Sequence, residues 1–510
     1  PVDMSACVDE FGNDLGFPVN QFLVYTKEPY PSPQRMQELA KTWGVTLVGK
    51  LPSLGIWQMQ CDCRTWEELD AFMEKAEESP EVDFTSMNFA MEFIRGGSAA
   101  DGVCKAGGDL DDLAGAERLA LDSMGYYQTV VLFQELQKKM NIQTVKIAII
   151  DGQFCRDFLK SSFETVSSRV EEKGSSVEKA RKQDEELCGT PGYGHGAQVF
   201  GIVGADDEDG GVSGLLNRTL KTSFTISLMP MLSGLAPDGQ ETPENKYKPY
   251  LSDFFEKLTP DALKNIDIIN ISMGSITNER EIRRKCTLIS PRDPDKCQEN
   301  EQTKRGNAKT KIKEIIEKNK NTVFVIAAGN NSSILDYPSF ESVSFPQTII
   351  SKSKNIVLVG GYDIPVQDDG TYPMWEGSNY YLMETTPGRR MVFAPAALPL
   401  LNTQNANGLP MILNEKGTSF STPAVTTLVA IIHTVAPTLT TEQIIKDVVL
   451  PGALLPVRRS DGIMVGHGIQ MFDTVSRALA QNPSIPAEVQ KLVDRDKDRQ
   501  PDGVWLTLHR

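Results

Sequence analysis

Four apolar runs, each ending in glycine or in a polar residue, constrain the fold of this chain most strongly. They are KIAIID (146–151), IDIINISMG (266–274), TVFVIAAGN (322–330) and NIVLVGG (355–361). Continuous Val/Ile runs are typical of strands that are covered on both faces, and amphipathic stretches separate these four along the chain. The sequence from about residue 120 therefore predicts an α/β domain with a parallel, doubly covered sheet. Polar residues at strand ends are where the active sites of such sheets lie, and Asp151 and Asn330 end two of the runs.

The first 95 residues predict a separate α+β unit. A strand QFLVYT is followed by a helix opening at Ser32 and Pro33, by the strands VTLVGK and GIWQMQC, and by a helix for which Thr65 and Glu68 form a capping box. VDFTSMNFAMEFI then closes a β-α-β-β-α-β order, which is the ferredoxin-like arrangement.

We expect four segments along the chain. Residues 96–115, rich in Gly, Ala and Asp, read as an exposed linker that holds a processing site. The segments are a unit over 1–95, the linker over 96–115, the catalytic domain over 116–485 and a C-terminal tail over 486–510.

Charge, hydropathy and cysteine usage exclude several partners. The formal net charge of -16 argues against nucleic acid or an anionic membrane surface as a partner. No run of about 18 apolar residues exists, so we expect no membrane span. The start PVDMSACVDEF has neither a basic nor an apolar signal region, which we interpret as an export signal already removed.

The eight cysteines lack metal-binding spacing, which favours disulfides and a secreted or extracytoplasmic protein over free thiols in a cytosolic one. Cys286 and Cys297 bracket a polar loop and are the preferred pair.

The strongest local signal is GTSFSTPAVTTLVAIIHTV, which begins at Gly417. It puts Ser419 at the start of a long apolar helix, where backbone N–H groups can meet a developing oxyanion. A serine there is more commonly a helix cap. Asp151, His195 and Asn330, however, also occupy Gly-rich strand ends or turns, and together the four supply a hydroxyl, an imidazole base, an orienting carboxylate and an oxyanion donor.

The motifs IAIIDGQF, GHGAQVFGI, VIAAGN and GTSFSTP resemble the four signature blocks of the subtilisin-like serine proteases, in that family's Asp, His, Ser order. The resemblance implies that Asp151 orients the imidazole, His195 is the general base, Ser419 the nucleophile and Asn330 the side-chain oxyanion donor. Gly152 departs from the Ser or Thr common beside the aspartate and removes one hydrogen bond to the carboxylate.

The resemblance also implies which residues bind substrate. Those expected to pair with a peptide or to line the specificity pocket are Ser272, Met273, Gly274, Ala327, Ala328 and Gly329.

A second GHG triplet surrounds His467. It resembles the family's closing turn, so we expect a structural role for His467 rather than a catalytic one. The N-terminal unit resembles the family's pro-domains, which implies an intramolecular chaperone and inhibitor of a zymogen.

The predicted function is therefore a secreted serine endopeptidase acting on proteins or peptides. An inactive, peptide-binding relative with a permanent N-terminal domain is the alternative. The chemistry requires no cofactor. The acidic runs Asp206 to Asp209 and Asp494 to Asp502 each leave open a structural calcium site or a solvated loop.

Overall fold

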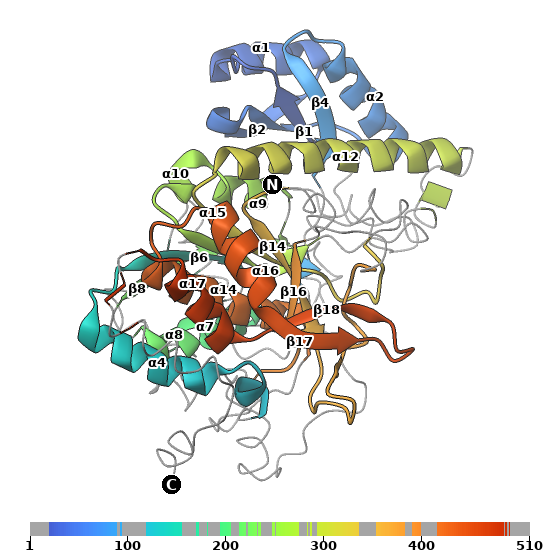
Figure 1. Ribbon diagram of the computed structural model, residues 1–510. Helices are drawn as coiled ribbons and strands as arrows, with labels where there is room; N and C mark the ends of the chain where they lie inside the picture. Colours follow the sequence, from blue (N-terminus) through green and yellow to red (C-terminus); the bar gives the residue numbers. More distant parts are fainter. Residues whose placement is uncertain are drawn as a thin grey trace, which may run out of the picture.

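The computed structural model contains a small N-terminal unit and a larger domain that follows it in the chain (Figure 1). The residues that it describes are 20–88, 92–93, 119–152, 154–155, 170–172, 181, 194–205, 214–220, 223–231, 233–235, 247–249, 251–274, 283, 286–287, 293–335, 353–382, 390–398, 416–483, 485–486 and 489.

The N-terminal unit has the predicted order of elements. They are β1 (Gln21–Thr26), α1 (Pro33–Trp43), β2 (Thr46–Leu51), β3 (Ile56–Gln60), α2 (Trp66–Glu77) and β4 (Val82–Met87), with a short 3-10 turn η2 (Pro52–Leu54) after β2. The sheet is antiparallel in the order β2-β3-β1-β4, which confirms the ferredoxin-like prediction.

The N-terminal cap of α1 is as predicted from the sequence, and that of α2 is as predicted in part. Ser32 caps α1 as expected, accepting a hydrogen bond from the Arg35 backbone. The capping box at α2 is only half correct. Thr65 accepts from the Glu68 N–H, but the Glu68 carboxylate accepts from the Arg64 N–H instead of returning to Thr65.

The larger domain contains a 10-stranded sheet in the order β15-β17-β18-β16-β14-β13-β11-β6-β8-β7. Its central strands β8, β6, β11, β13, β14 and β16 pair in parallel, as the apolar runs predicted. The strands are β6 (Val145–Asp151), β7 (Val170–Glu172), β8 (Phe224–Pro230), β11 (Ile268–Ile271), β13 (Val323–Ala327), β14 (Ile356–Tyr362), β15 (Tyr372–Pro373), β16 (Met391–Pro395), β17 (Ala453–Arg458) and β18 (Met464–Ile469).

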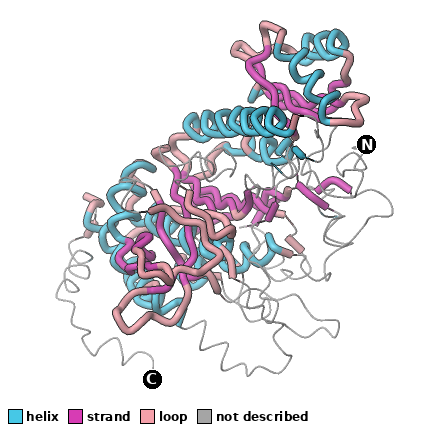
Figure 2. Tube along the Cα trace, turned by 90° about the vertical axis from the view of Figure 1, so that its right-hand side faces the viewer, coloured by secondary structure: helices cyan, strands magenta, loops and turns pink. Residues whose placement is uncertain are grey.

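Helices cover both faces of this sheet (Figures 1 and 2). Alternate residues of β6 enter two different cores: Ile147 and Ile149 pack with one set of helices, Ala148 and Ile150 with the other. On the first face lie α4 (Tyr126–Lys139), α7 (His195–Gly204), α8 (Leu215–Thr219), α14 (Thr418–Val435) and α17 (Met471–Ala480), together with the consecutive turns α15 (Thr441–Gln443), η5 (Ile444–Val449) and α16 (Leu450–Gly452). On the second face lie α9 (Leu251–Lys257), α10 (Pro260–Leu263) and α12 (Pro294–Lys318), and beyond them the N-terminal unit.

The predicted run 266–274 is not one strand. It divides at Ser272 into β11, inside the large sheet, and β12 (Met273–Gly274), which leaves that sheet. β12 pairs antiparallel with β5 (Glu92–Phe93), the short strand that follows the N-terminal unit, with Met273 opposite Phe93 and Gly274 opposite Glu92. A second small sheet joins β9 (Ser233–Leu235) to β10 (Tyr247–Pro249).

Within the described residues, α14 is the one helix that is long and apolar enough to cross a membrane. Its apolar window is 94% buried inside the protein, as expected of a core helix. The residues of α14 that follow Ser419 therefore belong to the hydrophobic core of the domain.

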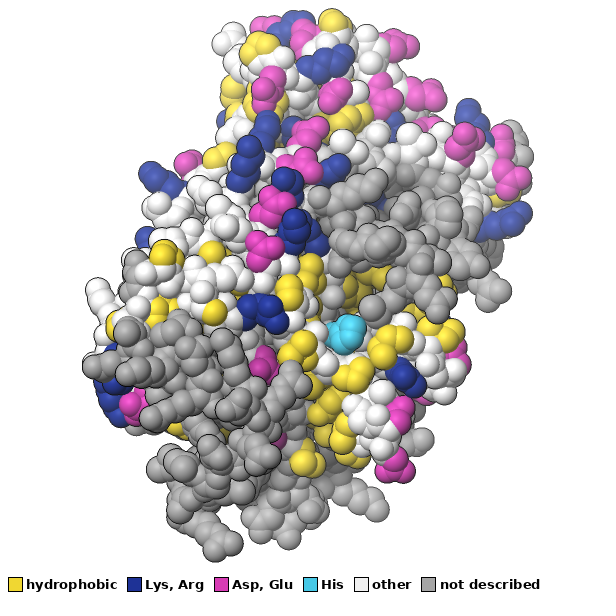
Figure 3. Space-filling model, in the orientation of Figure 1, with side chains coloured by type: hydrophobic (Ala, Val, Ile, Leu, Met, Phe, Trp, Pro, Cys, Tyr) yellow, Lys and Arg dark blue, Asp and Glu magenta, His cyan; other side chains and the backbone are white. Residues whose placement is uncertain are grey.

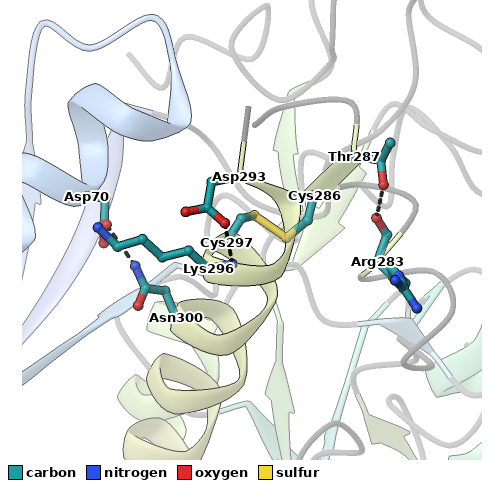
Figure 4. Close-up of a disulfide and its surroundings, with 8 residues drawn as sticks. All are labelled: Asp70, Arg283, Cys286, Thr287, Asp293, Lys296, Cys297 and Asn300. Carbon is teal, nitrogen blue, oxygen red and sulfur yellow. Dashed lines mark hydrogen bonds between the residues drawn. A yellow bond between two sulfur atoms is a disulfide. The ribbon is translucent and has the colours of Figure 1, made fainter. Parts of the chain in front are cut away.

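Cys286 and Cys297 form a disulfide, which confirms the predicted pair (Figure 4). The bond joins the start of α12 to the segment before it, next to Asp293, whose side chain caps α12 by accepting from the Lys296 N–H. A disulfide between Cys61 and Cys63, which the sequence did not predict, lies in the N-terminal unit, and Cys155 is also disulfide-bonded.

Candidate active site

Asp151 and His195 meet at the carboxyl end of β6. Asp151 is the last residue of that strand and is fully buried, while His195 is the first residue of α7 and is 3% exposed. The Nδ1 atom of His195 lies 2.9 Å and 3.1 Å from the two carboxylate oxygens of Asp151. The buried side chain of Asp151 thus holds the imidazole in one orientation.

The backbone around the pair explains the glycines in both motifs. The Gly152 N–H donates to Asp151 Oδ1 at 2.7 Å, so the backbone at this position supplies one hydrogen bond to the carboxylate. The Gly196 N–H donates to the Gly152 carbonyl at 2.8 Å, and a β-carbon at Gly196 would lie 2.3 Å from that oxygen. Only glycine therefore lets α7 approach β6 closely enough to bring the two side chains together.

Ser419 lies in the first turn of α14 and is fully buried. The ring of the next residue, Phe420, packs against the His195 ring with their centroids 5.8 Å apart. The residue that follows the nucleophile candidate therefore contacts the base candidate, although Ser419 and His195 are 224 positions apart in the sequence.

The carbonyl of Ser419 is tied to the strand expected to bind substrate. Ser272 Oγ donates to the Ser419 carbonyl oxygen at 3.1 Å and accepts from Asn270 Nδ2 at 2.9 Å. Asn270 Oδ1 in turn accepts from Thr426 Oγ1, two turns further along α14. This buried chain of hydrogen bonds fixes the start of α14 relative to β11 and β12.

Asn330 is oriented by Thr418, the residue before the serine. Its Oδ1 accepts from the Thr418 backbone N–H at 3.0 Å and from the Thr418 hydroxyl at 2.8 Å. Both contacts engage the carbonyl end of the amide, so its Nδ2 end is the donor that faces away from Thr418. Sequence reasoning missed Thr418, although its place inside the GTS motif was a signal.

The stretch Ala327, Ala328 and Gly329 is fixed by Asn379, which sequence reasoning also missed. Asn379 Nδ2 donates to the Ala328 carbonyl at 2.9 Å, and its Oδ1 accepts from the N–H groups of Asn331 and Ser333. Gly329 has φ +102°, and a β-carbon there would lie 2.4 Å from Asn379 Nδ2. Nothing in the GSNYY segment around Asn379 marks this role.

The remaining substrate-binding candidates are Met273 and Gly274. They are buried in this form, and both pair with β5. A strand of the chain itself therefore occupies the edge at which the sequence predicted that a peptide would bind.

The other two described histidines lie elsewhere. His467 is a half-buried residue of β18, opposite Pro456, and burial lowers its pKa. His433 lies on α14 with Nε2 4.0 Å from an oxygen of Asp267. The histidine that contacts Asp151 is His195.

No cluster of three or more metal-ligating side chains exists within the described ranges. The acidic runs 206–209 and 494–502 lie outside those ranges, as does the whole predicted linker 96–115, so the calcium and processing predictions stay predictions.

Comparisons with known proteins find a matching family and similar folds. The model for the subtilase family matches residues 143–476. Fervidolysin from Fervidobacterium pennivorans, described as a keratinolytic enzyme related to subtilisin, is similar in structure with a TM-score of 0.54 and 15% identity; the match covers 91% of this chain and 61% of that one. The epidermin leader peptide processing protease EpiP from Staphylococcus aureus matches with a TM-score of 0.49 and 16% identity, over 91% of this chain and 99% of that one. No curated protein matched the chain.

Proposed function

Because the chain belongs to the subtilase family, we propose that it is a serine endopeptidase that cuts peptide bonds with Asp151, His195, Ser419 and Asn330. One observation carries the proposal most directly: both carboxylate oxygens of a buried aspartate lie within hydrogen-bonding distance of His195 Nδ1, beside the helix that begins with Ser419. A buried carboxylate in that position stabilises an imidazolium, which a general base must become.

In the proposed reaction, Ser419 Oγ attacks the substrate carbonyl carbon while its proton passes to His195 Nε2. The imidazolium then gives that proton to the leaving amine, and the C–N bond breaks to leave an acyl-enzyme. Water attacks the ester in the second half, again losing a proton to His195, which returns it to Ser419. Asp151 stays ionised and holds the ring in the same tautomer throughout.

The oxyanion of each tetrahedral intermediate would be met by the backbone N–H groups at the start of α14 and by Asn330 Nδ2. The two bonds from Thr418 fix the amide of Asn330 before any substrate arrives. Preorganised donors of this kind need no rearrangement when charge develops, and this is the source of their catalytic effect. All the required groups are protein groups, so we propose no cofactor for the chemistry and leave calcium as a structural proposal only.

The substrate is proposed to be an extended peptide or protein segment that pairs with β12. Pairing of β5 with β12 supports this, because it is a backbone-to-backbone contact that does not depend on the identity of the side chains. It also supports the zymogen proposal, in which the N-terminal unit assists folding, covers the site and is cut off within Gly97–Gly115. The disulfides support an extracytoplasmic location.

A fluorophosphonate label followed by peptide mapping tests the activity. We expect the label on Ser419, and no label in Ser419→Ala. Ser421→Ala is the matched control because the Ser421 hydroxyl, two residues away, bonds to the Ala394 and Pro395 carbonyls. A folded protein that takes no label would support the alternative, an inactive peptide-binding relative.

Self-processing has its own test. The wild-type protein should yield a fragment near the size of residues 110–510, whereas Ser419→Ala should accumulate as a folded, full-length chain. A gel time course with N-terminal sequencing of the large fragment measures this. An active wild type that stays intact would make the N-terminal unit a permanent domain.

A further inference from the structure

One face of α12 is a continuous docking surface for the N-terminal unit. At 100° per residue, Asn300, Lys304, Asn307, Lys311 and Lys318 fall within a sector of about 60° and extend along about 27 Å of helix. Figures 1 and 2 both show α12 lying directly beneath the sheet of the N-terminal unit. We call this set of five residues the docking face.

Every residue of the docking face contacts the N-terminal unit. Asn300 donates to the Asp70 carboxylate at 3.0 Å (Figure 4), and Asn307 donates to the Thr85 carbonyl at 3.5 Å. Lys311 lies over the Tyr30 ring, 5.2 Å from its centroid, and Lys318 pairs with Glu28 at 2.9 Å. Polar contacts thus extend along the whole docking face.

The two sides of this contact differ in charge. Residues 20–88 contain eleven acidic and six basic side chains, whereas α12 contains five acidic and seven basic ones. Basic and acidic side chains lie interspersed on the visible face where the two parts meet (Figure 3). In an otherwise acidic protein, the docking face is therefore complementary to an acidic partner, which here is the N-terminal unit itself.

Lys304 and Lys311 are the two enclosed charges of the docking face, and Lys304 is the one that forms an ion pair with the N-terminal unit. The Lys304 side chain is 8% exposed, and its ammonium group donates to the Glu77 carboxylate and, at 2.8 Å, to the Thr85 hydroxyl. Glu77 also accepts from the Thr85 N–H at 2.9 Å and the Thr85 hydroxyl at 2.7 Å. A lysine from the catalytic domain is thus enclosed by a carboxylate and a hydroxyl of the N-terminal unit.

A buried ammonium that loses its carboxylate becomes strongly unfavourable, because nothing replaces the water it gave up. We propose that Lys304, bound by Glu77 and Thr85, is the ionic latch that keeps the N-terminal unit docked and so determines how often the substrate strand β12 is uncovered. The latch and β12 are connected through the chain, since β4, which carries Thr85, is followed by β5, which pairs with Met273 and Gly274. This inference rests on the proposed function, in which β12 binds substrate.

The test uses hydrogen exchange on the full-length Ser419→Ala chain, which should not cut itself. Lys304→Met and Glu77→Gln should each speed exchange in the segments that carry β4 and β12 by about tenfold to a hundredfold, the range for losing one charge-assisted hydrogen bond. Lys304→Arg keeps the charge, so exchange of β4 and β12 in this variant should be close to that in the parent chain. The double variant Glu77→Gln with Lys304→Met should exchange no faster than the faster single variant, because the two residues act as a pair.

Lys313→Met is the matched control on the same helix. Lys313 is 42% exposed and lies on the side of α12 opposite the docking face. Exchange of β4 and β12 in Lys313→Met should therefore stay within about twofold of the parent chain. Amides of β6 and β11 report whether each variant keeps its catalytic core. Exchange in Lys304→Met equal to that in Lys313→Met, or additive effects of the two single variants, would overturn the latch. Failure of Ser419 to take the fluorophosphonate would count against the peptidase and leave this result standing.

Discussion

Two neighbouring faces of α12 hold the molecule together in different ways. One face places Ile312, Ile315 and Ile316 in the core of the catalytic domain, where all three are buried. The other, the docking face, holds the N-terminal unit through amide, ammonium and carboxylate groups. Apolar contact is added at α9, where the rings of Tyr25 and Phe255 lie 5.7 Å apart.

This difference matches the proposed fates of the two parts: the core of the catalytic domain is permanent, whereas the N-terminal unit is proposed to be removed. Apolar burial is proportional to area and indifferent to pH and salt in the ordinary range, so it suits a permanent core. Polar contacts contribute less net free energy and weaken when one partner changes charge. The candidate active site combines the two, with hydrogen-bonded polar groups at the ends of strands whose bodies are apolar.

The largest expected effect is on peptidase turnover and comes from a change in the catalytic domain. His195→Ala should reduce peptidase turnover by about 10⁶-fold, the scale found when a member of this family loses its histidine. His467→Ala is the control and should stay within a few-fold, because His467 lies on β18, opposite Pro456. Turnover on a casein substrate, with circular dichroism to confirm folding, measures both. Equal losses in the two variants would break the assignment of the site.

Asn330→Ala should have a smaller effect, about 10² to 10³ in kcat, with KM little changed because the donor acts on the oxyanion. Thr418→Val sharpens the test. It removes the 2.8 Å hydroxyl contact to Asn330 but keeps the 3.0 Å backbone contact, so we expect a loss of about tenfold or less. A greater loss in Thr418→Val than in Asn330→Ala would mean that Thr418 acts by another route.

The sequence was sufficient to predict the strands and to single out the candidate site residues for one physical reason. Asp151, His195, Asn330 and Ser419 each lie at the end or start of an apolar element, inside a short glycine-containing motif that is readable locally. Parallel strands then bring their carboxyl ends to one edge of the sheet, so local signals are enough to predict that the site assembles.

Other parts depend on contacts that no local pattern reveals. Asn379 and Ala328 are 51 positions apart, and Lys304 and Glu77 are 227 apart. Lysines every seventh residue on a charged helix look like a solvated surface, and only tertiary packing buries Lys304. Likewise β5 and β12 pair over two residues each, which is too short a run to be recognised as strands.

Acid should loosen the docking contact. Burial raises the pKa of Glu77, but hydrogen bonds from Lys304 and Thr85 outweigh it, and the pKa lies below its usual value. A lowered pKa in the docked state means that docking is stabilised above the pKa of the undocked carboxyl and loses that stabilisation as pH falls through the docked value. Exchange of β4 in the Ser419→Ala chain, corrected for the intrinsic rate, should therefore rise as the pH falls to the ordinary glutamate pKa of 4.5 and below it. Glu77→Gln should remove most of this pH dependence, and an unchanged slope would assign it to other carboxylates.

The smallest expected effect on exchange is that of replacing Lys318, an exposed charge of the docking face, which we compare with the enclosed Lys304. Lys318 and Glu28 form a 2.9 Å ion pair, but their side chains are 63% and 65% exposed, whereas Lys304 is 8% exposed. Exposed pairs contribute little because water competes for both partners, so Lys318→Met should change exchange of β12 by less than about threefold. Salt sharpens the distinction, since about 0.5 M NaCl screens exposed charges far more than enclosed ones. At that salt the Lys318→Met chain should match its parent, while Lys304→Met should still exchange at least about tenfold faster. Comparable effects of the two lysines at both salt concentrations would mean that the docking face acts as a diffuse field of charge, with no single latch within it.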